Sequence, residues 1–115
     1  MFEQVERSFR ELAPGVEFCS LRLVYEEHEM LAVCRGVVQP VRRGEDLGAM
    51  VTVFSGGALG YAATPDLSPA GLRQALDRAL SWAKACAGHA LVGLAALERE
   101  PRTGCYRGPE LSPWE

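Results

Sequence analysis

A glycine-rich step followed closely by a helix start is the feature that most constrains the fold of this chain. Residues 55–64 read Ser-Gly-Gly-Ala-Leu-Gly-Tyr-Ala-Ala-Thr, and Ser68 and Pro69 come soon after. Glycine tolerates the positive φ that a tight hairpin turn demands, so Gly57 is predicted to be a turn residue and Gly60 a site of close packing. A serine hydroxyl caps free helix amides and proline needs none there, so Ser68 is predicted to be an N-cap. The stretch therefore predicts a short hairpin that leads into a helix.

Two amphipathic helices are predicted from apolar residues at three-and-four spacing. The longer spans residues 69–87, and one side of it carries an apolar stripe: Leu72, Leu76, Ala79, Leu80, Ala83 and Ala87. The shorter spans residues 2–12, where Phe2, Val5, Phe9 and Leu12 repeat until Pro14 and Gly15 stop the pattern. One long helix and one short amino-terminal helix are therefore available to cover a sheet.

The segment between these helices has the period and composition of β-strands. From residue 16 the apolar positions alternate, and the polar run 26–29 is predicted to turn the chain into a second strand at 30–34. Residues 37–41 are predicted to form a strand near an edge or a bulge, because Pro40 cannot donate to a central ladder. Residues 47–54 are apolar at both parities, which favours the centre of the sheet. We therefore expect an α+β fold with a mostly antiparallel sheet of four or five strands packed against the long helix.

The length of 115 residues indicates one domain. We expect this domain to cover residues 1–98, with residues 99–115 as a linker or tail, because proline and glycine are frequent there and apolar residues are few. Residues 90–97 lack a polar face, and the sequence leaves open whether they form a strand or a helix.

Charge and composition argue against two kinds of partner. The net charge is −3, and the basic group Arg35, Arg42 and Arg43 is offset by Glu45 and Asp46, so no nucleic-acid partner is expected. No apolar run reaches the roughly 20 residues of a membrane span, so no membrane partner is expected. The amino terminus lacks the pattern of a secretory signal, so we expect a cytoplasmic protein with reduced thiols.

Catalytic and metal-ligating residues are predicted to be absent from this chain. His28 and Glu29 form the one His-Glu step, but no second histidine follows a helical turn later, and the local period is that of a strand. His89 is expected to cap the end of the long helix. Cys19, Cys34, Cys86 and Cys105 lie too far apart in sequence for the usual zinc spacing. Cys19, Cys34 and Cys86 are expected to be buried small hydrophobes.

Large apolar side chains suggest where a partner could bind. Trp82 lies beside the stripe of the long helix, while Met50 and Phe54 belong to the strand that is apolar on both sides. One long and one short helix cannot cover both faces of a sheet, so Met50, Phe54 and Trp82 are predicted to contribute to an interface. Tyr61 is expected to fill the space between sheet and helix.

The order of these elements resembles the amino-terminal domain of the TldD/PmbA zinc metallopeptidases, which are also described as modulators of DNA gyrase. The residues that carry the resemblance lie within 2–88: Gly48, the run 51–54, the turn 57–62, Thr64, the step 66–68, Leu72, and Ala79 with Leu80. The resemblance implies a non-catalytic domain that shapes a peptide chamber and contributes to a dimer contact. It places the zinc site on a carboxy-terminal domain absent from this chain, toward which residues 99–115 would lead.

The same resemblance bears on cofactors and partners. It implies no cofactor in this chain, with zinc held by the absent domain and peptide substrate reached only through it. It also implies a homo- or hetero-oligomer of family members in the cytoplasm. The alternative is a stand-alone binding module that keeps the fold, pairs with a protein partner and has no peptidase role.

Overall fold

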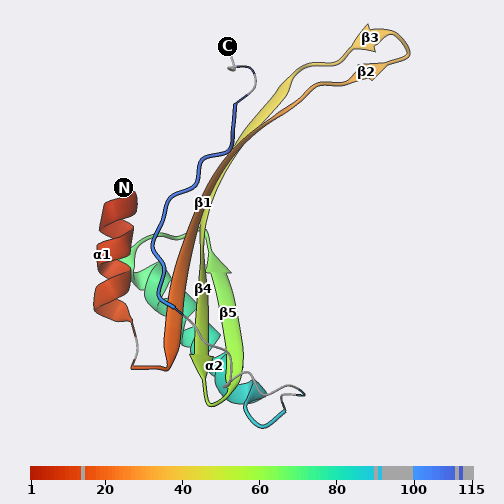
Figure 1. Ribbon diagram of the computed structural model, residues 1–115. Helices are drawn as coiled ribbons and strands as arrows, with labels where there is room; N and C mark the ends of the chain where they lie inside the picture. The colour runs from red at the N-terminus through yellow and green to blue at the C-terminus, as the bar shows by residue number, and fades with distance from the viewer. Residues whose placement is uncertain (14, 90, 92–99, 111, 113–115) are drawn as a thin grey trace.

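Two helices and five strands make up the fold (Figure 1). The computed structural model describes residues 1–13, 15–89, 91, 100–110 and 112. In chain order the elements are α1 (Phe2–Leu12), β1 (Phe18–Met30), β2 (Val33–Cys34), β3 (Val37–Val38), β4 (Arg42–Ser55), β5 (Ala58–Thr64) and α2 (Pro69–Cys86). The expected α+β class and both predicted helices are confirmed.

The main sheet has three antiparallel strands in the order β1-β4-β5. β4 is the central strand, as the apolar residues at both parities of 47–54 predicted. In the middle of the sheet Val51 pairs with Leu21 on one side and with Ala62 on the other. The turn between β4 and β5 consists of Gly56 and Gly57, whose φ angles of 62° and 81° are the left-handed values of a two-residue hairpin.

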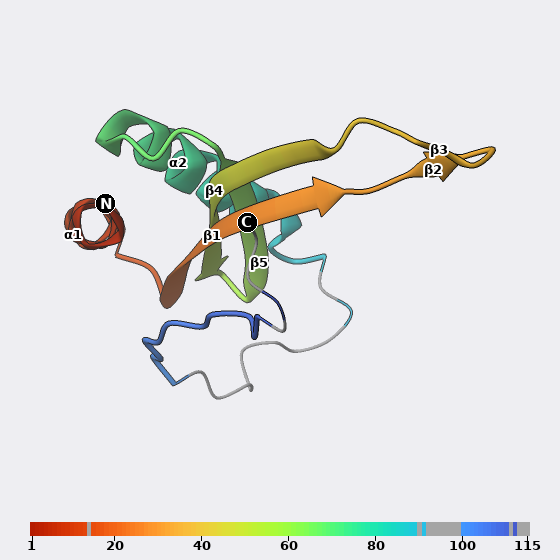
Figure 2. The ribbon, with the colours of Figure 1, turned by 90° about the horizontal axis from the view of Figure 1, so that it is seen from above.

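Both helices lie on the same side of the sheet (Figure 2). α2 packs on β4 and β5, and its buried side is formed by Gly71, Leu72, Ala75, Leu76, Ala79 and Ala83. α1 lies beside α2 and β1, where Val5 joins Ala49 and Leu72 in a buried cluster. This side of the sheet therefore carries the main hydrophobic core.

Small residues line the contact between α2 and β5, which we call the seam. It consists of Ala58, Gly60 and Ala62 on the strand and Ala79 and Ala83 on the helix, all of them buried. A Cβ atom added at Gly60 would overlap the carbonyl oxygen of Ala79 and the amide nitrogen of Ala83, both backbone atoms. Gly60 therefore lets the helix backbone approach the strand directly.

β1 and β4 continue past the helices as a two-stranded ribbon, which we call the arm (residues 25–47; Figure 1). The arm ends in the short β2–β3 pair, whose turn is formed by Arg35 and Gly36 at φ angles of 51° and 78°. With the arm the principal extents of the molecule are 57 × 34 × 25 Å. The arm therefore makes the molecule elongated.

The arm corrects the predicted strand pairing. Residues 26–29 were predicted to form a turn, but they lie inside β1, which pairs with β4 as far as Met30 and Arg42. A polar run signals a turn only where a strand is covered on one face, and both faces of the arm meet solvent. Of the strand predicted at 37–41 only Val37–Val38 forms, and it pairs with β2. The main sheet therefore has three strands and a separate small sheet has two, rather than one sheet of four or five.

Two predictions fall largely on residues outside those described. The choice between strand and helix for 90–97 concerns residues of which the structure describes Leu91 alone, and the expected domain end at residue 98 is also outside the described ranges. Neither helix in the described part of the chain has the length and apolar character needed to cross a bilayer.

Candidate functional site

The face of the main sheet opposite the helices carries exposed apolar side chains, and we call it the open face. Side chains alternate along a strand, and Gly60 faces α2, so Leu59 and Tyr61 of β5 face away from it. Leu59 is 40% exposed and Tyr61 is 68% exposed. The register places Tyr61 beside Thr52 and Ser20, with Ala63, Met50 and Arg22 in the next row. The open face is therefore a mixed surface with an apolar edge along β5.

The three side chains predicted to form an interface do not form one patch. Met50 is half-buried on the open face. Phe54 shares that face but is only 2% exposed, between Phe18 and Leu59 in the same row, so it offers almost no surface for a partner. Trp82 is 57% exposed on α2, on the opposite side of the sheet. The structure thus places Trp82 apart from Met50.

Tyr61 lies on the face of the sheet opposite to the one predicted from the sequence. It was expected to pack between sheet and helix, but Gly60 and Ala62 hold that position. The signal was present in the sequence, because small residues at 58, 60 and 62 alternate with larger ones at 59 and 61. Only the small set allows a helix to lie close to a strand.

The predicted structural residues take distinct positions around α2. Ser68 is the residue before the helix, and its Oγ accepts a hydrogen bond of 3.1 Å from the amide of Gly71. Asp66 supports the same turn, since its Oδ1 accepts from the amide of Ser68 at 3.0 Å. The hydrogen bonds from Ser68 lower the pKa of the Asp66 carboxyl. Gly57 occupies the second position of the β4–β5 turn.

The possible metal ligands are dispersed across the described part of the molecule. His28 lies on the arm, where its ring packs over Gly44 and its Nδ1 is 3.8 Å from Oδ2 of Asp46. His89 follows the end of α2, where Gly88 has a φ of 81°. The four cysteines are free. Cys19 is half-buried, which raises the pKa of its thiol, whereas Cys34 and Cys86 are exposed and not buried as expected. Among the described residues no three such side chains gather as a metal site, so these residues do not fit a zinc ion.

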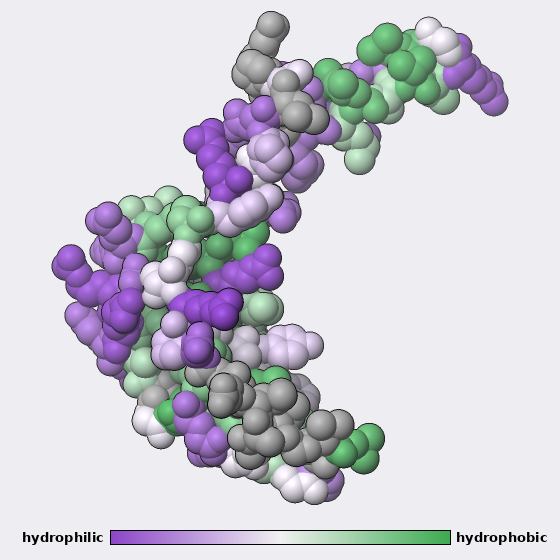
Figure 3. All heavy atoms as spheres, in the orientation of Figure 1, coloured by the Kyte–Doolittle hydropathy of each residue, from purple (hydrophilic) through white to green (hydrophobic). Residues whose placement is uncertain are grey.

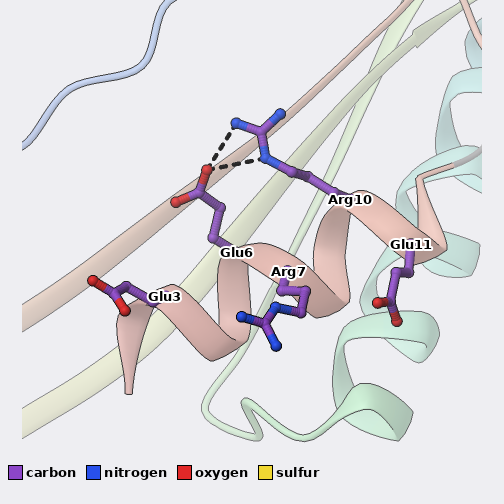
Figure 4. A pocket seen from close by; sticks show the side chains of 5 residues that line it. All are labelled: Glu3, Glu6, Arg7, Arg10 and Glu11. Carbon is purple, nitrogen blue, oxygen red and sulfur yellow. Dashed lines mark hydrogen bonds and ion pairs between the residues drawn. The ribbon is translucent and has the colours of Figure 1, made fainter.

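Two open hollows lie on the surfaces of the helices. One of about 400 Å³ is lined by α1 alone, through Glu3, Glu6, Arg7, Arg10 and Glu11 (Figure 4). Within it the guanidinium of Arg10 donates to Glu6 at 2.7 Å, an exposed pair one helical turn apart. The other, of about 610 Å³, lies at the start of α2 and includes Asp66 and Arg73. Charged side chains at i and i+4 on a solvated helix account for the α1 hollow without a ligand.

The tip of the arm is an exposed apolar surface that was not predicted from the sequence. Six apolar side chains there are each at least half exposed: Met30, Leu31, Val33, Val37, Val38 and Val41. They form an apolar cluster at the far end of the molecule (Figure 3). The sequence signal is the run of apolar residues on both sides of Arg35 and Gly36, which predicted strands of the main sheet.

These features define a small α+β domain that exposes apolar side chains on its open face and at the tip of the arm. A model of the family described as PmbA/TldA metallopeptidase domain 1 matches residues 19–83, more than half of the chain. The chain belongs to this family. A search of curated proteins finds no match. The matched segment runs from the start of β1 to the last buried turn of α2, so it contains both the seam and the arm.

Proposed function

We propose that this chain serves as the non-catalytic first domain of a TldD/PmbA-type zinc metallopeptidase. In this proposal another domain holds the zinc and cleaves the peptide, while this one forms part of the wall of the peptide chamber and of a dimer contact. The family match is the observation that carries the proposal. The dispersed positions of the two histidines and four cysteines in the described residues are compatible with it.

The open face is the surface through which we propose that the domain docks on the catalytic domain. Leu59 and Tyr61 expose apolar area on it, next to the half-buried Met50. The opposite face is covered by α1 and α2, so a neighbour that contacts the main sheet would do so on the open face. Peptide would then reach this domain only as part of the assembled chamber, in the cytoplasm, where the four free thiols stay reduced.

The docking test uses this chain and a separately expressed zinc-binding catalytic domain of the same family. Tyr61→Asp places a charge on the open face and is expected to weaken the complex by about tenfold or more, because a charge buried in an apolar contact lacks a partner. Gln74→Glu is the control, since Gln74 is exposed on α2, which covers the opposite face of the sheet. Affinity is measured by isothermal titration calorimetry. Equal affinities for the two variants would contradict the proposed docking face.

The chemical half of the proposal is tested on the chain alone. Purified protein is expected to hold far less than one zinc per chain by elemental analysis and to leave unfolded casein uncut. Metal-dependent cleavage that follows the protein through purification and disappears in His28→Ala would refute a non-catalytic role. A chain that binds a protein partner but never a catalytic domain of the family would instead favour the stand-alone binding module.

A further inference from the structure

The arm carries two features that the proposed docking face does not use. The first is its apolar tip, defined by the six side chains named above and flanking the Arg35–Gly36 turn. A two-stranded ribbon by itself is marginally stable in water, and both of its edges expose unpaired backbone groups. With about 100 Å² exposed per side chain, the tip presents on the order of 600 Å² of apolar surface, as much as the largest patch on a typical monomer.

The second feature is a ring of carboxylates around the arm nearer to the body, which we call the acidic belt. Glu26 lies directly opposite Asp46, and in the next rung Glu27 lies directly opposite Glu45. Like charges at directly opposite positions destabilise an antiparallel pair. Successive rungs face opposite sides of the ribbon, so the belt presents acid on both faces.

Few cationic side chains contact the acidic belt in the part of the chain that the structure describes. Its close contacts there are the Tyr25 hydroxyl, which donates to Oε1 of Glu27 at 2.6 Å, and His28, 3.8 Å from Asp46. That hydrogen bond to Glu27, with smaller contributions from burial and from the charges of Glu27 and Glu45, raises the pKa of Tyr25 to about 12. The charge of Glu27 makes the smallest contribution to the raised pKa of Arg107 in the tail. The ion-pair partner of Arg107 is Glu110, at 2.8 Å.

The charges of tip and belt are complementary. Arg35 is the one charged residue between Leu31 and Val41, whereas the belt carries four acids within two rungs. Arg43 is engaged nearer the tip, where it donates to Glu29 at 2.6 Å. A second arm laid alongside in the opposite direction would bring each Arg35 to the other belt. A tip-to-tip contact would instead place Arg35 against Arg35.

We propose that the arms of two copies of this chain pair side by side in opposite directions, each Arg35 lying on the acidic belt of the other copy. The two-fold axis then passes near Leu31, midway along the chain between Arg35 and Glu27, and apolar residues of both tips meet around it. The two tips together expose on the order of 1,200 Å² of apolar surface, and a contact that buries one side of each arm is therefore a small interface, to which the two Arg35 contacts add. The inference rests on the dimer contact of the proposed function and names its surface and partner.

Charge exchange on the full chain tests the pairing. By analytical ultracentrifugation the chain is expected to dimerise, more weakly at high salt. Arg35→Glu is expected to weaken the dimer about tenfold or more, and the double variant with Glu27→Arg to restore it to within about threefold, because each two-fold contact regains opposite charges. Arg35→Asn also removes the charge and suits the left-handed φ of the turn, so it should weaken the dimer without unfolding the arm. The control Arg73→Glu, on the exposed side of α2, should change nothing.

Disulfide trapping distinguishes the two possible directions. In a background with Ser at all four native cysteine positions, Leu31→Cys should cross-link two chains under mild oxidation, since a disulfide needs close Cα atoms. A chain keeping only Cys34 should not, because the antiparallel register separates its two copies by about 20 Å. Cross-linking through Cys34, a monomer at high protein concentration, or charge reversal without rescue would each overturn the pairing. A dimer weakened by Trp82→Ala but not by the arm variants would overturn it too, while leaving docking on a catalytic domain intact.

Discussion

Gly60→Ala should strongly destabilise this domain, although it adds a single methyl group. The added Cβ would overlap the carbonyl oxygen of Ala79 and the amide nitrogen of Ala83. Both are backbone atoms inside α2, so no side-chain rotation relieves the overlap and the helix must move away from β5. Overpacking a buried site costs about 1 to 3 kcal/mol, and we expect the upper end of that range here because the contact is rigid.

The size of this effect is large relative to the stability of a small domain. Domains of this kind are stable by about 5 to 15 kcal/mol, so a loss of about 3 kcal/mol is a substantial fraction. It corresponds to a fall in Tm of about 10 °C or more for a domain of this size. The measurement is thermal unfolding followed by circular dichroism, with urea unfolding to give the free energy.

Two glycine controls separate steric overlap from backbone conformation. Gly104→Ala should change stability by less than about 0.5 kcal/mol, because a Cβ there meets nothing within 4 Å and the residue is exposed. Gly57→Ala should cost about 1 to 2 kcal/mol, since open space surrounds it but its φ of 81° disfavours a side chain. A Tm for Gly60→Ala within about 2 °C of the parent would refute the seam argument. Recovery of the parent Tm in the double variant Gly60→Ala with Ala83→Gly would also refute it. The second substitution removes a side chain and leaves the overlapped backbone atoms in place.

Two further predictions concern the start of α2. Ser68→Ala should lower stability by about 1 kcal/mol in urea unfolding, because the amide of Gly71 loses its cap, and Ser68→Asn should recover most of the loss. Asp66→Ala should lower the Tm at neutral pH, because the hydrogen bonds with Ser68 favour the folded carboxylate and lower the pKa of Asp66 below 3.8. Its contribution is therefore present above that value and disappears as the pH falls through the folded pKa, so the Tm values of parent and variant should converge in acid. A Tm difference that is constant from about pH 7 to about pH 2 would contradict this assignment.

The sequence predicted the elements that have strong local signals. Adjacent glycines and the Ser68-Pro69 step set the β4–β5 hairpin and the start of α2, and the apolar residues at both parities of 47–54 identified the central strand. In each case the residues that form the element lie within a few positions of each other. Local conformational preference was enough there.

The arm could not be predicted in the same way, because its signal depends on the absence of a covering layer. The run from Glu26 to Glu29 resembles a turn when one face of the strand is assumed to be buried, and it pairs as a strand when both faces are solvated. The residues of the apolar tip were predicted to be strands of the main sheet for the same reason. Which residues are covered is a property of the tertiary fold, which the apolar patterns of β4 and β5 reflect and the sequence of the arm does not.

The seam also affects how sequences of this fold can change. Alanine and glycine have no side-chain rotamers to lose on folding, so Ala58, Gly60, Ala62, Ala79 and Ala83 bring strand and helix together at almost no cost in side-chain entropy. In a core of larger residues, one side chain can become smaller while its neighbour becomes larger. The residues of the seam are already the smallest, so such compensating substitutions are not open to them. We therefore expect these five positions to change together, with a shift of the whole helix, or to stay small.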